Sequence, residues 1–158
     1  MKIKSDSEQI ADYPKLTGFV ELFRRVAIAL HIPSYWQFII DVTEHQEGDG
    51  VWMTAMTVDP DPTYYHCKVT VDSILLGDHY SYDLADSWSE QYMNVRELIC
   101  HELMHVFLSE INDFFERMIN LPGIPVIHRQ NFLTQYGVLE EQLIQKLVQG
   151  MISSLPLA

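Results

Sequence analysis

Cysteine is scarce in this chain, which has only Cys67 and Cys100 among its 158 residues. Two cysteines cannot build the disulfide framework that small secreted domains use, and their separation does not match a zinc-binding pair. Cys100 directly precedes a histidine, but neighbouring residues on a helix point about 100° apart. We therefore expect both cysteines to be reduced residues of the core.

Basic residues are also few. The chain has 10 lysines and arginines against 22 aspartates and glutamates, which gives a formal net charge of −12. Such a charge repels phosphate backbones, and no basic stripe offsets it, so we expect no nucleic-acid partner. Long apolar runs are missing as well, and the polar segment Met1–Glu8 is unlike a secretory signal. These absences predict a cytoplasmic protein without a membrane partner.

Apolar residues, by contrast, are abundant. Hydrophobic residues make up 47% of the chain and aromatic residues 11%, as in ordinary globular proteins. A chain of this length can bury a core without a metal or disulfide staple. Because no repeat or low-complexity segment divides the sequence, we expect residues 1–158 to form a single domain.

Hydrophobic periodicity predicts the helices and strands. Apolar residues recur at helical spacing from Leu16 to Leu30, and Asn94–Met118 contains no glycine or proline that would break a helix. The remaining predicted elements are three alternating segments and a last helix, at Tyr35–Val42, Val51–Val58, Tyr64–Leu76 and Gly137–Ile152.

The connections suggest how these elements pair. The charged, glycine-containing segment Glu44–Gly50 predicts a hairpin between the first two strands, and the prolines of Asp59–Pro62 are expected to interrupt pairing before the third. Gly77–Gln91 lacks periodicity and is expected to form a surface loop. The sequence thus predicts an α+β fold with an N-terminal helix, a small, mainly antiparallel three-stranded sheet, a long central helix and a C-terminal helix.

The pentapeptide His101-Glu102-Leu103-Met104-His105 is the most informative feature of the chain. Residues four apart lie on the same face of a helix, so His101 and His105 can bind one metal ion. Glu102 then lies beside them, where a carboxylate can act as a general base toward a water molecule. The pattern H-E-x-x-H is typical of zinc hydrolases, and it predicts one bound Zn²⁺.

Catalytic zinc sites usually hold three protein ligands, so one ligand remains to be found. Glu140 is the first choice, because at 100° per residue it falls within the apolar stripe of the last helix, where a carboxylate needs a cation. Glu141 lies near the edge of that stripe and is the second choice. His128, in the segment before the helix, is a further candidate.

The residues resemble the gluzincin class of zinc metallopeptidases, in which an H-E-x-x-H helix is followed by a glutamate on a separate helix. The order of elements is similar to that of the small peptidases often carried by phages and prophages, a minimal zincin-like fold. The residues after Glu140 depart from the usual gluzincin pattern of a nearby Asp or Asn. Other families that share the short motif add a later histidine ligand, which only His128 could supply.

This resemblance implies a zinc metallopeptidase that hydrolyses a peptide or protein substrate. It would assign pairing with the substrate main chain to the strand at Tyr64–Val71, whose edge offers unpaired amides. Tyr136 and His128 are weaker candidates for the donor that stabilises the oxyanion. The alternative from another functional class is a catalytically silent zincin-fold protein that binds a partner.

Overall fold

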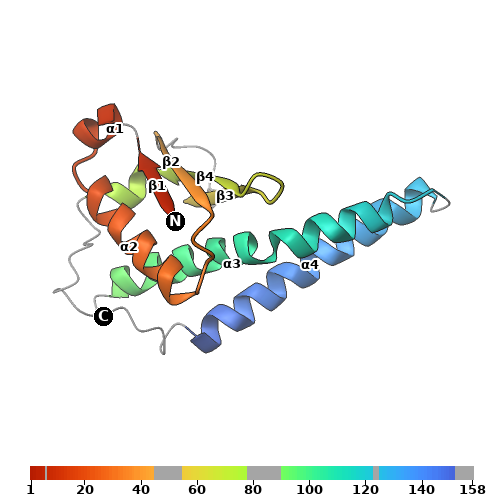
Figure 1. Ribbon diagram of the computed structural model, residues 1–158. Coiled ribbons are helices and arrows are strands. Elements are labelled where there is room, and N and C mark those ends of the chain that lie inside the picture. The colour runs from red at the N-terminus through yellow and green to blue at the C-terminus, as the bar shows by residue number, and fades with distance from the viewer. Residues whose placement is uncertain (6, 45–54, 78–89, 123–124, 152–158) are drawn as a thin grey trace.

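The computed structural model describes residues 1–5, 7–44, 55–77, 90–122 and 125–151 (Figure 1). The predicted turn at Glu44–Gly50 and the predicted loop at Gly77–Gln91 lie almost wholly outside the described residues. The elements in chain order are strand β1 (Lys2–Ser5), helices α1 (Ser7–Asp12) and α2 (Leu16–Ala29), strands β2 (Gln37–Thr43), β3 (Met56–Asp61) and β4 (His66–Asp72), a 3₁₀ turn (Ser73–Leu76), and helices α3 (Glu90–Ile119) and α4 (Val126–Met151).

The fold is α+β, as expected, but the predicted sheet was wrong. The described sheet has four strands in the order β1-β2-β4-β3, and the β1–β2 and β2–β4 pairs are parallel. Only β3 and β4 pair antiparallel. The expected hairpin between the first two predicted strands is therefore absent from the described sheet, because β4 lies between β2 and β3.

The parallel pair β1–β2 was missed because Lys2-Ile3-Lys4-Ser5 is short and mostly polar. In the structure these residues align with Gln37–Ile40, and α1 and α2 form the crossover between the two strands. A parallel pair requires such a crossover, usually a helix. The predicted first helix thus has a structural role beyond covering the sheet, since it connects two neighbouring parallel strands.

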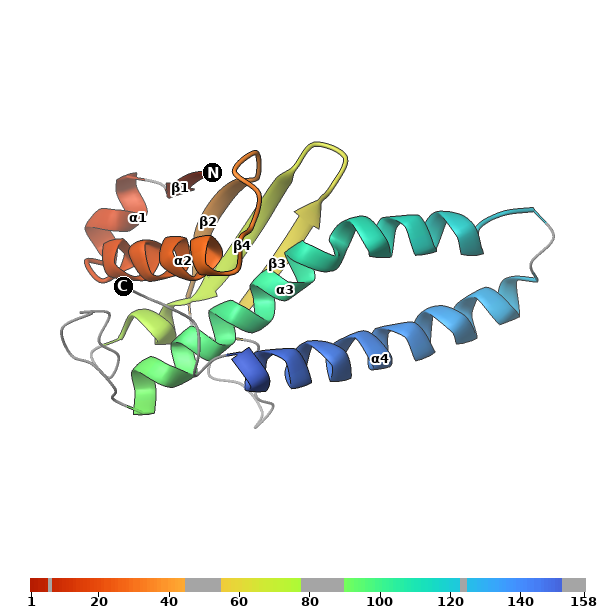
Figure 2. The same ribbon diagram turned by 60° about the horizontal axis from the view of Figure 1, so that its bottom comes forward.

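One face of the sheet packs against α2 and α3 (Figures 1 and 2). Buried and accessible residues alternate along β2, with Phe38 and Ile40 buried and Ile39 exposed between them. Phe23 of α2 meets Phe38 edge to face, with ring centroids 5.1 Å apart. Cys67 and Cys100 are both buried and free, as predicted, and burial raises their pKa values to about 12 and about 11.

Strand β3 continues through Pro60, which pairs with Cys67, so the expected interruption by the prolines is wrong. Proline is tolerated there because β3 is an edge strand of the described sheet, where a missing N–H breaks no ladder on the outer side. The hairpin to β4 closes through Tyr65, whose φ of 53° lies in the left-handed region. Strand β4 begins at His66 and ends at Asp72, and the 3₁₀ turn follows it. β4 lies between β2 and β3 and is therefore a central strand.

Helix α3 contains the H-E-x-x-H motif and extends beyond the sheet (Figures 1 and 2). Its first part is buried against the core through residues such as Val95, Ile99 and Leu103. Its second part pairs with α4 to form a two-helix extension, which we call the arm and define as residues 106–122 and 125–147.

Helix α4 begins at Val126, eleven residues before the predicted start at Gly137. The early part escaped prediction because its apolar residues are largely exposed and therefore do not form a single stripe. Gly137 lies inside the helix with open space around it. Phe115 of α3 holds this part of α4 by stacking on Phe132 and Tyr136, with centroid distances of 6.1 and 4.9 Å.

Among the helices of the described residues, none is both long enough and apolar enough to cross a membrane.

Candidate metal centre

The two motif histidines lie on the face of α3 that meets α4. They are four positions apart in the sequence, and their rings meet edge to face with centroids 5.2 Å apart. The side chains of both are about a quarter exposed, and His101 lines a cavity. The helix thus holds the pair of imidazoles in the arrangement that the pentapeptide predicts.

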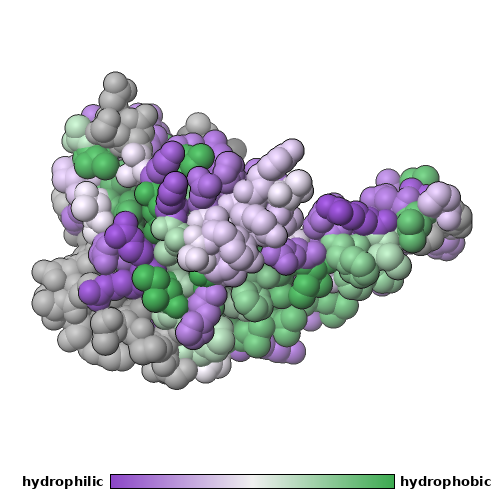
Figure 3. All heavy atoms as spheres, viewed as in Figure 1, coloured by the Kyte–Doolittle hydropathy of each residue, from purple (hydrophilic) through white to green (hydrophobic). Residues whose placement is uncertain are grey.

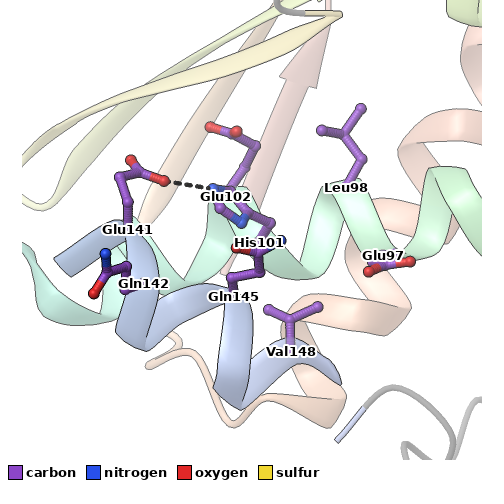
Figure 4. A pocket seen from close by; sticks show the side chains of 8 residues that line it. All are labelled: Glu97, Leu98, His101, Glu102, Glu141, Gln142, Gln145 and Val148. Atoms are coloured by element: carbon purple, nitrogen blue, oxygen red, sulfur yellow. Dashed lines mark ion pairs between the residues drawn. The ribbon is translucent and has the colours of Figure 1, made fainter. Parts of the chain in front are cut away.

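Glu141 of α4 faces both histidines. Its two carboxylate oxygens lie 3.2 Å from His101 Nε2 and 3.2 Å from His105 Nε2. Figure 4 shows the approach of Glu141 to His101. Ligand atoms of these three residues all lie within 4.8 Å of one another, and they are the group among the described residues that could hold a metal ion.

These distances fit a zinc ion. With Zn–N and Zn–O bonds of about 2.1 Å, neighbouring ligands of a tetrahedral site are roughly 3.4 Å apart. The nitrogen-to-oxygen distances of 3.2 Å are close to that value. Two imidazoles and one carboxylate are also a donor set that catalytic zinc sites use, with the fourth position left for water.

Glu140, the first choice from the sequence, lies on the other side of His105. Its Oε1 is 3.3 Å from His105 Nδ1, whereas Glu141 faces Nε2 of the same ring. Only 12% of the Glu140 side chain is exposed, compared with 57% for Glu141. The sequence analysis therefore identified the inward-facing carboxylate, but the structure brings its neighbour into the group of ligand atoms.

A chain of hydrogen bonds extends from Glu140 away from the histidines. Asn112 of α3 donates from Nδ2 to Glu140 Oε1 over 2.7 Å, and the Tyr136 hydroxyl donates to Asn112 Oδ1. The same oxygen of Glu140 thus contacts both the amide of Asn112 and Nδ1 of His105. A metal-bound histidine usually donates its second ring N–H to such a carboxylate, which fixes the tautomer.

Asn112 was missed in the sequence analysis. It follows His105 by seven residues, which is close to two helical turns, so the two side chains share one face of α3. That spacing was a usable signal. Tyr136, proposed from the sequence as an oxyanion donor, instead directs its hydroxyl to Asn112, and its pKa is raised by burial and by the charge of Glu140.

His128 lies in the first turn of α4 and is exposed. Twelve residues separate it from Glu140, which corresponds to roughly 18 Å along a helix. It is outside the group of ligand atoms found among the described residues. The structure therefore does not bring this third candidate to the two motif histidines.

Glu102 is 8% exposed and lies beside the same group of side chains (Figure 4). Burial raises the pKa of its carboxyl to about 7, although the neighbouring His105 and a backbone hydrogen bond from Val58 of β3 act to lower it. A carboxylate with a pKa near neutrality is a suitable general base, because it can both take and return a proton. The contact with Val58 also shows that β3 passes next to this residue.

The His101 pKa is lowered, mainly by burial and then by the adjacent His105, while Glu141 acts in the opposite direction. A lowered pKa favours the neutral ring, and only a neutral imidazole nitrogen has the lone pair that binds a metal. The electrostatics of the site thus favour the metal-binding form of His101.

A cavity of about 490 Å³ opens onto these residues. Its lining comes from both helices: Glu97, Leu98, His101, Glu102, Glu141, Gln142, Gln145 and Val148 (Figure 4). A second hollow, of about 480 Å³, lies between the β3–β4 hairpin and α3, at residues that include Pro60, Thr63, Ser109 and Asn112. The first cavity reaches His101 and Glu102 directly, whereas the second lies further along α3.

Comparisons of the chain with protein-family models, with curated proteins and with solved structures give no match. What this site does must therefore be argued from its own geometry.

Proposed function

We propose that the protein is a zinc-dependent metallopeptidase in which His101, His105 and Glu141 bind one Zn²⁺ ion. The observation that carries this proposal is the meeting of both His Nε2 atoms with one carboxylate, at distances that suit zinc. Glu140 was the first ligand predicted from the sequence, and we now assign it to the second ring nitrogen of His105. The proposal rests on the donor set and on the position of Glu102 beside it.

Each protein group has a distinct task in this proposal. A bound zinc ion supplies Lewis acidity, which lowers the pKa of water and polarises a carbonyl. Glu102 takes the proton from the attacking water and delivers it to the leaving amine. Glu140, held by Asn112, keeps the Nδ1–H tautomer of His105, so that Nε2 stays free to bind the metal.

Strand β3 is the element best placed to bind the main chain of a substrate. The sequence analysis assigned this task to the strand at Tyr64–Val71, which was wrong because β4 is central. β3 is an edge strand of the described sheet, and its Val58 is next to Glu102. An extended peptide that pairs with an exposed edge gains main-chain hydrogen bonds whatever its side chains are.

Metal removal tests the proposal directly. We expect the purified protein to hold one zinc ion per chain, and we expect a chelator to abolish hydrolysis of an unfolded protein substrate and added zinc to restore it. Elemental analysis and a gel-based cleavage assay measure the two properties separately. A protein that lacks stoichiometric zinc and also fails to bind added zinc would contradict the proposed site.

The neighbouring glutamates provide a matched pair of variants that tests the ligand assignment. Glu140→Gln should weaken zinc binding about 10–100-fold, which is typical for the partner of a ligating histidine. Glu141→Gln should weaken it more, because it removes a charge from the ligand set itself. Competition with a chromophoric chelator measures both affinities. The reverse order would instead make Glu140 the third ligand.

A further inference from the structure

The arm exposes an unusual amount of apolar surface. Thirteen large hydrophobic residues on it or at its tip are more than a third exposed: Phe107, Ile111, Phe114, Met118, Leu121, Val126, Ile127, Phe132, Leu133, Val138, Leu139, Leu143 and Leu147. Figure 3 shows hydrophobic residues gathered along the visible face of this extension. None of them lines either of the two cavities described above, so the proposed zinc site does not account for them.

We propose that this surface binds the arm of a second copy of the chain, so that two arms form a four-helix bundle. A large apolar side chain offers on the order of 150–200 Å², so thirteen such residues that are about half exposed present roughly 1,000 Å². Soluble monomers rarely expose a patch of more than about 600 Å². A stable interface needs about 800 Å² from each partner, which the arm can supply.

The spacing of the residues suits packing between helices. Phe107, Ile111, Phe114 and Met118 follow one another at intervals of four, three and four residues, which is the heptad spacing of a coiled-coil seam. On α4, Leu139, Leu143 and Leu147 recur at intervals of four. A two-helix hairpin buries only the stripe between its own helices, whereas a four-helix bundle buries a second stripe on each helix.

The charge of the arm favours another protein over a membrane surface. The arm has three basic residues, Arg117, Arg129 and Lys146, and five acidic ones, Glu110, Asp113, Glu116, Glu140 and Glu141. Helices that lie on membranes are usually rich in Lys and Arg, which attract anionic lipids. A twofold pairing of identical arms needs no such charge, because the same apolar patch is used on both sides.

The mass in solution tests this proposal. We expect light scattering and sedimentation to give twice 18.4 kDa for the wild type. Phe114→Glu should weaken the dimer about thirtyfold or more, as substitution at the centre of an interface does. Leu139→Glu places the same charge on α4 and should also weaken the dimer. Circular dichroism and zinc content should be unchanged in both variants, since both side chains are exposed.

Ile28→Glu is the matched control. Ile28 lies on α2, outside the arm, and is 61% exposed, the same fraction as Phe114. This variant should remain dimeric. The proposal is overturned if the wild type is a monomer. A monomer that binds vesicles of phosphatidylcholine and phosphatidylserine would show that the apolar surface of the arm contacts lipid instead. It is also overturned if a dimer tolerates both Phe114→Glu and Leu139→Glu, or if Ile28→Glu separates it.

Discussion

Glu102→Gln should retain the metal and lose about 10²–10⁴-fold of the hydrolysis rate. The substitution keeps the shape of the side chain but removes the group that takes and returns the proton, and general acid–base catalysis is typically worth that factor. Glu102 is outside the proposed ligand set, so the zinc content should stay at one ion per chain. The measurement is kcat for an unfolded protein substrate, with metal analysis of the same samples.

Glu110→Gln is the control for this change. Glu110 is on the same helix, about two turns beyond Glu102, and its side chain is exposed. We expect wild-type activity from this variant. If Glu102→Gln cleaves as fast as the wild type, then Glu102 is not the base. If neither the zinc-loaded wild type nor the variant cleaves any peptide, the geometry supports the alternative of a zincin-fold protein that binds a partner without catalysis.

His101→Ala should lose stoichiometric zinc. The loss in affinity should exceed the 10–100-fold expected for residues that only support a ligand, because a ligand itself is removed. Elemental analysis after dialysis and a chelator competition measure the loss without reference to activity. Folding should persist, since the imidazole is partly exposed and the hydrophobic core surrounds other residues of α3.

His128→Ala is the control for His101→Ala, because it removes a histidine that lies outside the proposed ligand set. His128 is exposed at the start of α4, roughly 18 Å along the helix from Glu140. Its replacement should leave the zinc content unchanged. A zinc content that falls in His128→Ala, and not in His101→Ala, would contradict the proposed centre and restore the third ligand candidate considered from the sequence.

The sequence was informative where one helix determines the geometry. The spacing of His101 and His105 sufficed to place two imidazoles on one face of α3, and the periodicity of Leu16–Leu30 located α2 to within a residue. The third ligand was harder, because adjacent helical residues differ by only about 100°. Which of Glu140 and Glu141 meets Nε2 depends on the rotation of α4 against α3, and local periodicity does not determine that rotation.

The sheet was the least predictable part of the fold. Alternation shows that Gln37–Thr43 is a strand, but it does not show which strand pairs with it. The neighbour of β2 turned out to be β4, which arrives after β3 in the chain. Proximity in sequence favoured a hairpin, but β2 pairs in parallel with β4, and β3 pairs with the other edge of β4. Pro60 was misleading because its effect depends on whether the strand has an outer neighbour.

The attachment of α4 has one further consequence. Among the described residues of α4, only Ile144 and Val148 are buried, and the partly buried Met151 and the stacking of Phe132 and Tyr136 on Phe115 add to their contacts. A cation bound by ligands from both α3 and α4 would link the two helices. By mass action, its binding would favour the arrangement of α4 against α3 that is described above. If the proposed site binds zinc, loss of the ion would therefore remove one of the links that hold α4 to α3.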